Sequence, residues 1–506
     1  MDVGDGSLRA SVEAGLWPLI ETLLGSHEVA GLAVAVVRDE EVVSRGFGVR
    51  DVGTGESVTP ETMFHLASVS KPCVATAIVS LATARDGSGP VLDLDAPVAE
   101  WVPEFTLADG REREVTARHL LSHSSGLPDV AEYGWHDPQL GDEALSEFAS
   151  SLSGWRLQAE PGSTFSYSNA GFELLGLLLA RATGTTFENA VRRQVLAPMR
   201  MRNSTFLRAE VPLHLAASPH VGMPLSVPQS AYPYTRRHAP SSTLHSNLVE
   251  MCRWMVAHFE PAEVVAGGSD NQWVRLDAGL LDLMWRPVVQ VGRPPWDEAA
   301  ALGWAVGSYR GHRTLSHGGT DPGFVSRLVL VPERRTGFVA LANSNTVPTS
   351  TIAAAALDIA LTDVGHTVDS DVRPDALGEG VAAMRALRPA VVGPVARTLS
   401  RSGPEAAASV FHRLAALEPP EFDLGDDGFT DAVWGAIELH RTGLAWPLLR
   451  LWTELRPDSS AAWTMTGWAR HVDGQADLAR PVLQHALDLD PHNVDAALIM
   501  NGLPST

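Results

Sequence analysis

The chain has 506 residues, of which 45% are apolar and 19% charged, as expected for a globular protein of two or three domains. Acidic side chains outnumber basic ones by 60 to 38, and the formal charge of −22 disfavours nucleic acid and anionic membranes as partners. Two cysteines cannot form a disulfide framework, and we find neither a basic, apolar leader nor an 18-residue apolar run. These features predict a cytoplasmic protein without a membrane span.

Lysine is nearly absent from the chain. The 38 basic residues comprise 37 arginines and one lysine, Lys71. Such a shift is typical of a GC-rich coding bias, which leaves lysine where arginine fails. Arginine stays protonated in proteins, whereas a buried lysine can lose its proton. Lys71 is therefore a candidate base, the alternative being chance survival on the surface.

The first 362 residues combine strands and helices. Residues 29–50 predict a β-hairpin, residues 59–64 a turn with Pro60, and residues 65–84 a buried helix that begins near Ser68. Gly- and Pro-rich loops and short helices follow to about residue 210. Residues 302–345 return to strands, and a helix at 350–362 closes the unit. The pattern predicts an α+β fold with a mainly antiparallel sheet.

The rest of the chain has a helical pattern. Residues 363–380 are acidic and contain Gly and Pro, which predicts a linker before an all-α domain at 381–506. Within that domain a 34-residue period is typical of tetratricopeptide-like repeats, although ordinary amphipathic helices can produce similar patterns. The period relates Ala445, Leu448, Leu449, Leu455 and Pro457 to Ala479, Val482, Leu483, Leu489 and Pro491.

Ser68 precedes Lys71 by three residues, so the two side chains share one face of a helix. A serine at a helix N-terminus gains from the positive end of the helix, which stabilises a developing alkoxide. A desolvated amine nearby can take the serine proton. This spacing predicts a nucleophile and its base.

Two further polar groups adjoin apolar elements. Tyr167 and Asn169 stand at the start of a second apolar helix, where a hydroxyl can relay a proton and an amide can bind a carbonyl. The alternative is that Ser168 or Asn169 only caps this helix. His317, Gly318, Gly319 and Thr320 end a strand. Their glycines allow backbone to approach a ligand, or form a plain turn.

In this order, SVSK, YSN and HGG resemble the three motifs of the serine β-lactamase and penicillin-binding-protein superfamily. The surrounding segments GLAVAVV, HLLSHSSGLPD and PGSTFSYSNAGFELLG also resemble its class C β-lactamase/esterase branch. The resemblance covers about residues 10–362. It implies an antiparallel sheet flanked by helices, with the site between the sheet and a helical lobe.

The resemblance also implies roles for these residues. Ser68 would be the acylated nucleophile, Lys71 its base and Tyr167 the group that passes the proton to the leaving group. Asn169 would face the substrate, and the N–H groups of Ser68 and Thr320 would form the oxyanion hole. His317, with Gly318 and Gly319, would line the substrate site.

His317 replaces the lysine with which the family holds the carboxylate of β-lactams. The resemblance therefore favours the esterase and peptidase branch over β-lactamase activity. A histidine with the usual pKa of about 6.5 is mostly neutral at pH 7 and gains a proton toward pH 6. We therefore expect neutral substrates to be preferred near pH 7.5 and anionic analogues to gain as the pH falls.

His119 and His123 have the spacing of metal ligands on a helix, but no acid-rich partner follows them. Because the segment is also typical of the resembled family, we expect no metal and no cofactor.

We expect a serine hydrolase that forms an acyl-enzyme from a small-molecule or peptide ester or amide. An acyltransferase or a peptide cyclase would use the same acyl-enzyme. The alternative from another class is a non-catalytic binding protein that grips a partner through its helical repeats. In each case the C-terminal helices are candidates for a protein partner or for self-association.

Overall fold

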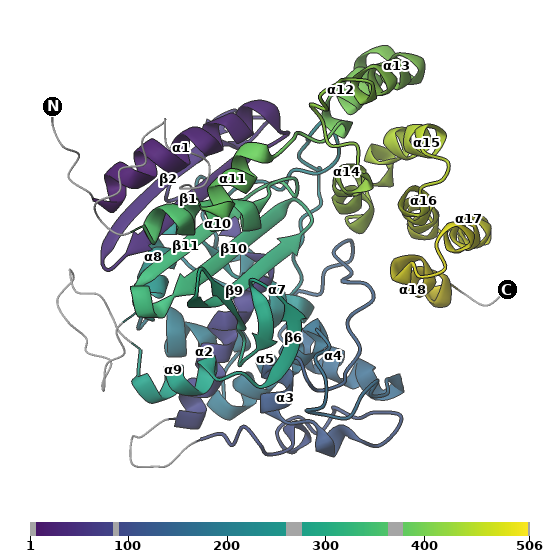
Figure 1. Ribbon diagram of the computed structural model, residues 1–506. Helices are drawn as coiled ribbons and strands as arrows, with labels where there is room; N and C mark the ends of the chain where they lie inside the picture. Colours follow the sequence, from purple (N-terminus) through teal and green to yellow (C-terminus); the bar gives the residue numbers. More distant parts are fainter. Residues whose placement is uncertain (1–6, 84–90, 260–275, 363–377, 504–506) are drawn as a thin grey trace, which may run out of the picture.

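The computed structural model describes residues 7–83, 91–259, 276–362 and 378–503. Its centre is a nine-stranded antiparallel sheet in the order β3-β2-β1-β11-β10-β9-β8-β7-β6 (Figure 1). The central strands are buried along almost their whole length because both faces of the sheet are covered. The strands are β1 Gly31–Arg38, β2 Glu41–Asp51, β3 Glu56–Ser57, β6 Val289–Arg293, β7 Asp297–Ala300, β8 Ala305–Tyr309, β9 His312–Asp321, β10 Phe324–Val331 and β11 Thr336–Ala342; a separate pair joins β4 Phe64–His65 to β5 His245–Ser246.

Helices cover the two faces of the sheet and divide the core. Alternate side chains of β1 enter different clusters: Val34 and Val36 pack with one set of helices, Ala33 and Ala35 with the other. The first set is α1 Leu8–Ser26, α10 Thr349–Ala360 and α11 Glu379–Ala386. The second includes α2 Ser70–Thr83, α5 Asn169–Thr183, α8 Leu248–Val256 and α9 Ala278–Trp285. Short helices complete the lobe beside α5: α3 Ala117–Leu121, α4 Ala144–Ser151, α6 Phe187–Val191 and α7 Ala239–Ser242.

The predicted α+β class with an antiparallel sheet is confirmed. The predicted hairpin appears as β1 and β2, and the strands predicted between 302 and 345 appear as β8 to β11. Helix α1 and the edge strands β6 and β7 were not predicted from the sequence. The buried helix begins slightly later than predicted, because Ser68 lies in a 3₁₀ turn, Ala67–Val69, and α2 starts at Ser70.

The C-terminal part is all-helical, and its first helices pack on Trp135, Val221 and Met223 of the part that contains the sheet. These helices are α12 Val392–Ser402, α13 Pro404–Ala415, α14 Asp426–Glu438, α15 Trp446–Leu455, α16 Ser460–Val472, α17 Ala476–Leu489 and α18 Val494–Gly502. Most of the predicted linker, residues 363–377, lies outside the described residues. Its last two residues, Glu379 and Gly380, already belong to α11, whose Val381 and Met384 pack in the core beside α10. The tetratricopeptide assignment stays a prediction.

Among the helices in the four described ranges, none combines the length and the apolar character that crossing a membrane requires.

Candidate active site

Ser68 is presented by a strained turn in front of α2. Ala67 adopts a left-handed φ of 47°, a conformation that costs a non-glycine residue of order 1 kcal/mol or more. The Ser70 hydroxyl donates to the Ala67 carbonyl over 2.6 Å and accepts from the Leu244 N–H over 2.9 Å. Ala67 and Val69 are buried while Ser68 stays partly exposed. The turn thus leaves the serine hydroxyl accessible on a rigid support.

Lys71 is fully buried beside this serine. Its Nζ lies 2.8 Å from Ser68 Oγ and 2.9 Å from the carbonyl oxygen of Ser241. Burial lowers the pKa of Lys71 to about 8, and the nearby carboxylates of Glu173, Asp129 and Asp321 limit this fall. The amine is therefore close enough to accept the serine proton, and a useful fraction of it is neutral near pH 7.

Tyr167 is hydrogen bonded to the side chain of Ser68. Burial raises the pKa of Tyr167, so the phenol keeps its proton at neutral pH. The Lys71 Nζ atom is 5.0 Å from the centre of the Tyr167 ring. Lysine rather than tyrosine is thus the group able to act as base, and the tyrosine hydroxyl can carry a proton onward.

The two histidines with metal-like spacing do not share a helix face. His119 lies in α3, where its Nδ1 accepts from the Thr116 N–H in a capping box. His123 lies beyond the end of α3 with a left-handed φ of 52°, and its ring stacks on Tyr167 with 4.1 Å between centres. Its Nδ1 accepts from the Ser168 N–H. The first imidazole caps a helix and the second supports the tyrosine.

Asn169 is the first residue of α5, and its side chain faces an exposed loop. Its backbone N–H donates to Asp129 Oδ1 over 2.7 Å, and its Nδ2 donates to Asp129 Oδ2 over 3.1 Å and to the Tyr133 hydroxyl. The capping alternative fits Ser168 only in part, because its hydroxyl donates to the Pro128 carbonyl and leaves the helix uncapped. A substrate contact of Asn169 stays a prediction.

Strand β9 runs against the Ser68 turn. A Cβ atom at Gly319 would lie 2.5 Å from the Leu66 oxygen and 2.9 Å from the Ser68 nitrogen, so only glycine fits there. A Cβ at Gly318 would meet the Arg327 guanidinium at 3.2 Å. Thr320 follows and is exposed. Gly319 therefore brings the strand beside Ser68, while the oxyanion hole assigned to Ser68 and Thr320 stays a prediction.

His317 is not a histidine with an ordinary pKa. Burial, with the positive charge of Lys71 as a second cause, lowers the pKa of His317 to about 3. Its Nδ1 donates to the Gly318 carbonyl over 2.7 Å, and its ring centre is 6.5 Å from that of Tyr167. The expected protonation near pH 6 is therefore wrong, because a partly buried, desolvated imidazole beside an amine stays neutral there.

A buried carboxyl group that was not predicted from the sequence lies near Lys71. Glu173 is fully buried, and its Oε1 accepts from the Ser241 hydroxyl over 2.6 Å and lies 3.1 Å from His238 Nδ1. Its Oε2 has no partner within the described residues. The available signal was that Glu173 is the only charged residue between Phe165 and Arg181 and lies one turn after Asn169.

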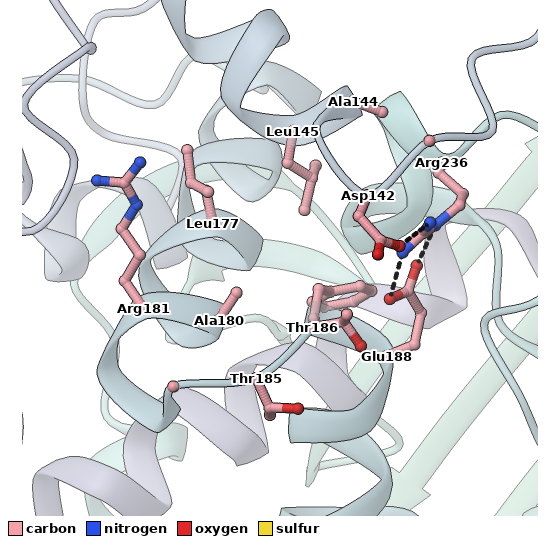
Figure 2. Close-up of a pocket in the computed structure, with 13 residues that line it drawn as sticks. Asp142, Ala144, Leu145, Leu177, Ala180, Arg181, Thr185, Thr186, Glu188 and Arg236 are labelled. Carbon is pink, nitrogen blue, oxygen red and sulfur yellow. Dashed lines mark hydrogen bonds and ion pairs between the residues drawn. The ribbon is translucent and has the colours of Figure 1, made fainter.

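Arg236 anchors the start of the segment that contains His238 and Ser241, the two residues that contact Glu173. Its guanidinium binds Glu188, 2.8 Å between Nε and Oε1, and Asp142, along one wall of a cavity of about 380 Å³ (Figure 2). Glu188 is 4% exposed, so the pair is well shielded. The lining of this cavity does not include Ser68 or Lys71, so the cavity is separate from the candidate site.

A second buried polar group lies next to the end of β9. Asp321 accepts from the Ser242 hydroxyl, and its Oδ2 is 2.6 Å from His65 Nε2. The His65 ring is also in edge contact with His245 and Tyr232. Residues that flank Ser68 and Thr320 in sequence are thereby fixed to one another.

Sequence comparisons agree with this architecture. Esterase EstB of Burkholderia gladioli is 36% identical over 228 residues, which span 42% of this chain and 56% of the esterase. Penicillin-binding protein 4 of Amycolatopsis lactamdurans is 28% identical over 322 residues, 62% of this chain and 80% of that protein. The match therefore spans little more than half of the esterase.

Solved structures show the same fold. A penicillin-binding protein homologue from Pyrococcus abyssi has a TM-score of 0.57 at 24% identity, covering 71% of this chain and 78% of its own. D-amino acid amidase from Ochrobactrum anthropi has a TM-score of 0.54 at 20% identity, covering 75% and 99%. The sequence profile of the Beta-lactamase family matches residues 18–362. Over these residues, with the Ser68 turn, α2, α5 and β9 among them, the chain belongs to the Beta-lactamase family of serine hydrolases.

Proposed function

We propose that the chain hydrolyses a carboxylic ester or amide through an acyl-enzyme on Ser68. The observation that carries this proposal is the 2.8 Å contact between Ser68 Oγ and the Nζ of a fully buried Lys71. With a pKa of about 8, roughly a tenth of the amine is neutral at pH 7. That fraction supplies a base where proton transfer is needed.

In the first step Ser68 Oγ attacks the substrate carbonyl carbon, and its proton passes to Lys71 Nζ. The tetrahedral oxyanion is held by the N–H groups of Ser68 and Thr320. The bond to the leaving group then breaks, and that group takes a proton through the Tyr167 hydroxyl, which Lys71 replenishes. Water next attacks the acyl-Ser68 ester, releasing the carboxylic acid and restoring the serine.

The test is labelling of the full chain with a fluorophosphonate, followed by tandem mass spectrometry. We expect one adduct, on Ser68, and no adduct in Ser68→Ala. Ser166→Ala, which alters a serine next to Tyr167, is the matched control and keeps the label. An unlabelled wild-type chain, or an adduct on another serine, contradicts the proposal.

Acyl transfer and peptide cyclisation share the first step and differ only in the second nucleophile. Product analysis with an added amine measures how the acyl-enzyme divides between water and amine. Cytoplasmic location is likewise a proposal, which cell fractionation tests.

A further inference from the structure

The loop between Pro128 and His136 contains no helix or strand, so side-chain contacts fix its shape. Two of its residues face the candidate site. The Asp129 carboxylate accepts hydrogen bonds from the backbone N–H and from the side-chain Nδ2 of Asn169, and this Nδ2 also donates to the Tyr133 hydroxyl. Asp129 is also one of the charges that raise the pKa of Lys71. This loop therefore sets the position of Asn169 and contributes to the charge around the base.

Three other residues of the loop, Glu132, Trp135 and His136, contact the C-terminal part. Glu132 Oε1 lies 3.2 Å from Nε2 of His440, just after α14, and the His440 ring stacks on His136 with 3.7 Å between centres. Trp135 is 3% exposed and belongs to the apolar cluster of α14 and α15. It also stacks on Tyr133, with 5.0 Å between ring centres and 6° between planes. The loop thus links the C-terminal helices to Asn169.

Glu132, His136 and His440 carry metal-ligating atoms within 4.8 Å of one another. Their two imidazole planes, however, are nearly parallel, at 20°. Ring nitrogens coordinate in the ring plane, so stacked rings cannot direct both lone pairs at one tetrahedral centre. The trio acts as a contact between the two parts of the chain.

Helix α14 also contacts the turn after β9. A Cβ at Gly435 would already lie 2.9 Å from Val221 Cγ1 and 3.3 Å from Asn345 Oδ1. Asn345 donates to the carbonyls of Asp321 and Phe324 and accepts from the Gly323 N–H. Figure 1 shows α14 as the C-terminal helix beside the sheet. The same helix therefore supports both the Asn169 loop and the strand end that carries Thr320.

We infer that the C-terminal helices are a positioning element of the catalytic site: His440 and α14 hold loop 129–136, which holds Asn169. The inference rests on the proposed function. Because His440 touches neither Ser68 nor Lys71 among its described contacts, it is a positioning residue, and its effect must pass through the loop. A helical region that served only to bind partners would leave the rate at Ser68 unchanged.

The test is a double-mutant cycle in the full-length protein, measured as kcat/KM on an acyl ester and as the Ser68 labelling rate. His440→Ala should lower both about 3- to 30-fold. In an Asn169→Ala background the same change should cost less than about twofold, because the residue it positions is already gone. His440→Gln, which keeps a donor for Glu132, should recover part of the loss. The matched control is His485→Ala, an exposed histidine of α17 that packs on Trp463 and should act as wild type.

Circular dichroism and thermal unfolding establish that each variant is folded. If His440→Ala does not fold, Glu132→Gln weakens the same contact from its exposed side and takes its place. Losses that multiply in the double mutant, or wild-type rates in His440→Ala and Glu132→Gln, overturn the inference. An unlabelled wild-type chain instead contradicts the proposed function, so the two failures are distinct.

Discussion

The catalytic part and the C-terminal helices bury different kinds of polar side chain. Buried ionisable groups among the described residues all lie between His65 and Asp358, and they include Lys71, Glu173 and Asp321. In the helices after residue 390, the polar side chains with almost no exposed surface that the structure describes are hydroxyls, Thr442, Ser459, Thr464 and Thr466, whereas Glu438 of α14 is partly buried, which raises its pKa to about 8. Burying charge is costly unless it is paired, so some of these groups are satisfied by structural partners, as Glu188 is by Arg236, while Lys71 and Glu173 lie at the candidate site. The helical part is instead stabilised by apolar packing between its helices.

The largest effect should come from Lys71→Arg. Arginine keeps the positive charge but cannot release its proton, so acylation of Ser68 should fall by at least about 100-fold. The second-order rate of fluorophosphonate labelling measures this. Lys71→Met, which removes charge with little change in size, should be as slow. Near-normal turnover in either variant would exclude Lys71 as the base.

Glu173→Gln should shift the pH profile of acylation. Glu173 is the largest of the opposing charges that favour the Lys71 ammonium, so its removal lowers the lysine pKa below about 8. The acidic limb of the kcat/KM profile should then move to lower pH. Other groups around the amine remain: Asp129, Asp321, Tyr167, His123 and His317.

The matched control for that shift is Glu188→Gln. This glutamate is also buried, but it pairs with Arg236 and is not among the charges acting on Lys71. Its acidic limb should stay in place. An unmoved limb in Glu173→Gln would mean that Glu173 has a structural role only.

His317 should set the preference between neutral and carboxylate-bearing esters. Since its pKa is about 3, the ratio of the two kcat/KM values should be constant between pH 5 and 8. His317→Lys adds a positive charge and should raise the ratio for the anionic ester about three- to tenfold at pH 7.5. His312→Lys, on the same strand but paired with Glu333, is the control. If the ratio of the two kcat/KM values does not change in His317→Lys, the side chain of residue 317 lies away from the substrate.

The smallest expected effect on ester hydrolysis should separate α15, which packs in the cluster of Trp135, from α17, which does not. Leu449 and Leu483 are both fully buried and stand 34 residues apart, but only Leu449 shares a cluster with Trp135. Either Leu→Ala change should cost about 2–5 kcal/mol of local stability. Leu449→Ala should also slow ester hydrolysis a few-fold, whereas Leu483→Ala should not. Equal activities of the Leu449→Ala and Leu483→Ala variants would mean that α15 and α17 do not differ in their effect on the site.

Local sequence patterns predicted much of this molecule. The apolar run of residues 31–38 and the three-residue spacing of Ser68 and Lys71 depend on neighbours in the chain, so pattern reasoning reaches them. Edge strands β6 and β7 carry weaker signals, because their polar and short segments resemble loops. The fold was therefore predictable where burial was continuous.

The parts that sequence reasoning missed depend on contacts between distant residues. The pKa of His317 follows from burial beside Lys71, which no local pattern specifies. Asp129 and Glu132 look like ordinary loop acids, yet they contact Asn169 and His440, which lie 40 and 308 residues away. Contacts over such separations leave no local pattern, so the link between the loop and the C-terminal helices could not be predicted from the sequence.

The lone lysine also affects how the protein can be handled. Lys71 is fully buried, as are both cysteines, Cys73 and Cys252, which are free thiols. Succinimidyl esters and maleimides therefore find no side-chain amine or thiol on the surface of the folded chain. A single cysteine introduced at an exposed position, such as Leu478 of α17, would be the one accessible side-chain thiol for a dye or a support. Slow modification mapped by mass spectrometry to the Lys71 side chain, and distinguished from that of the α-amino group, would then report opening around Lys71 itself.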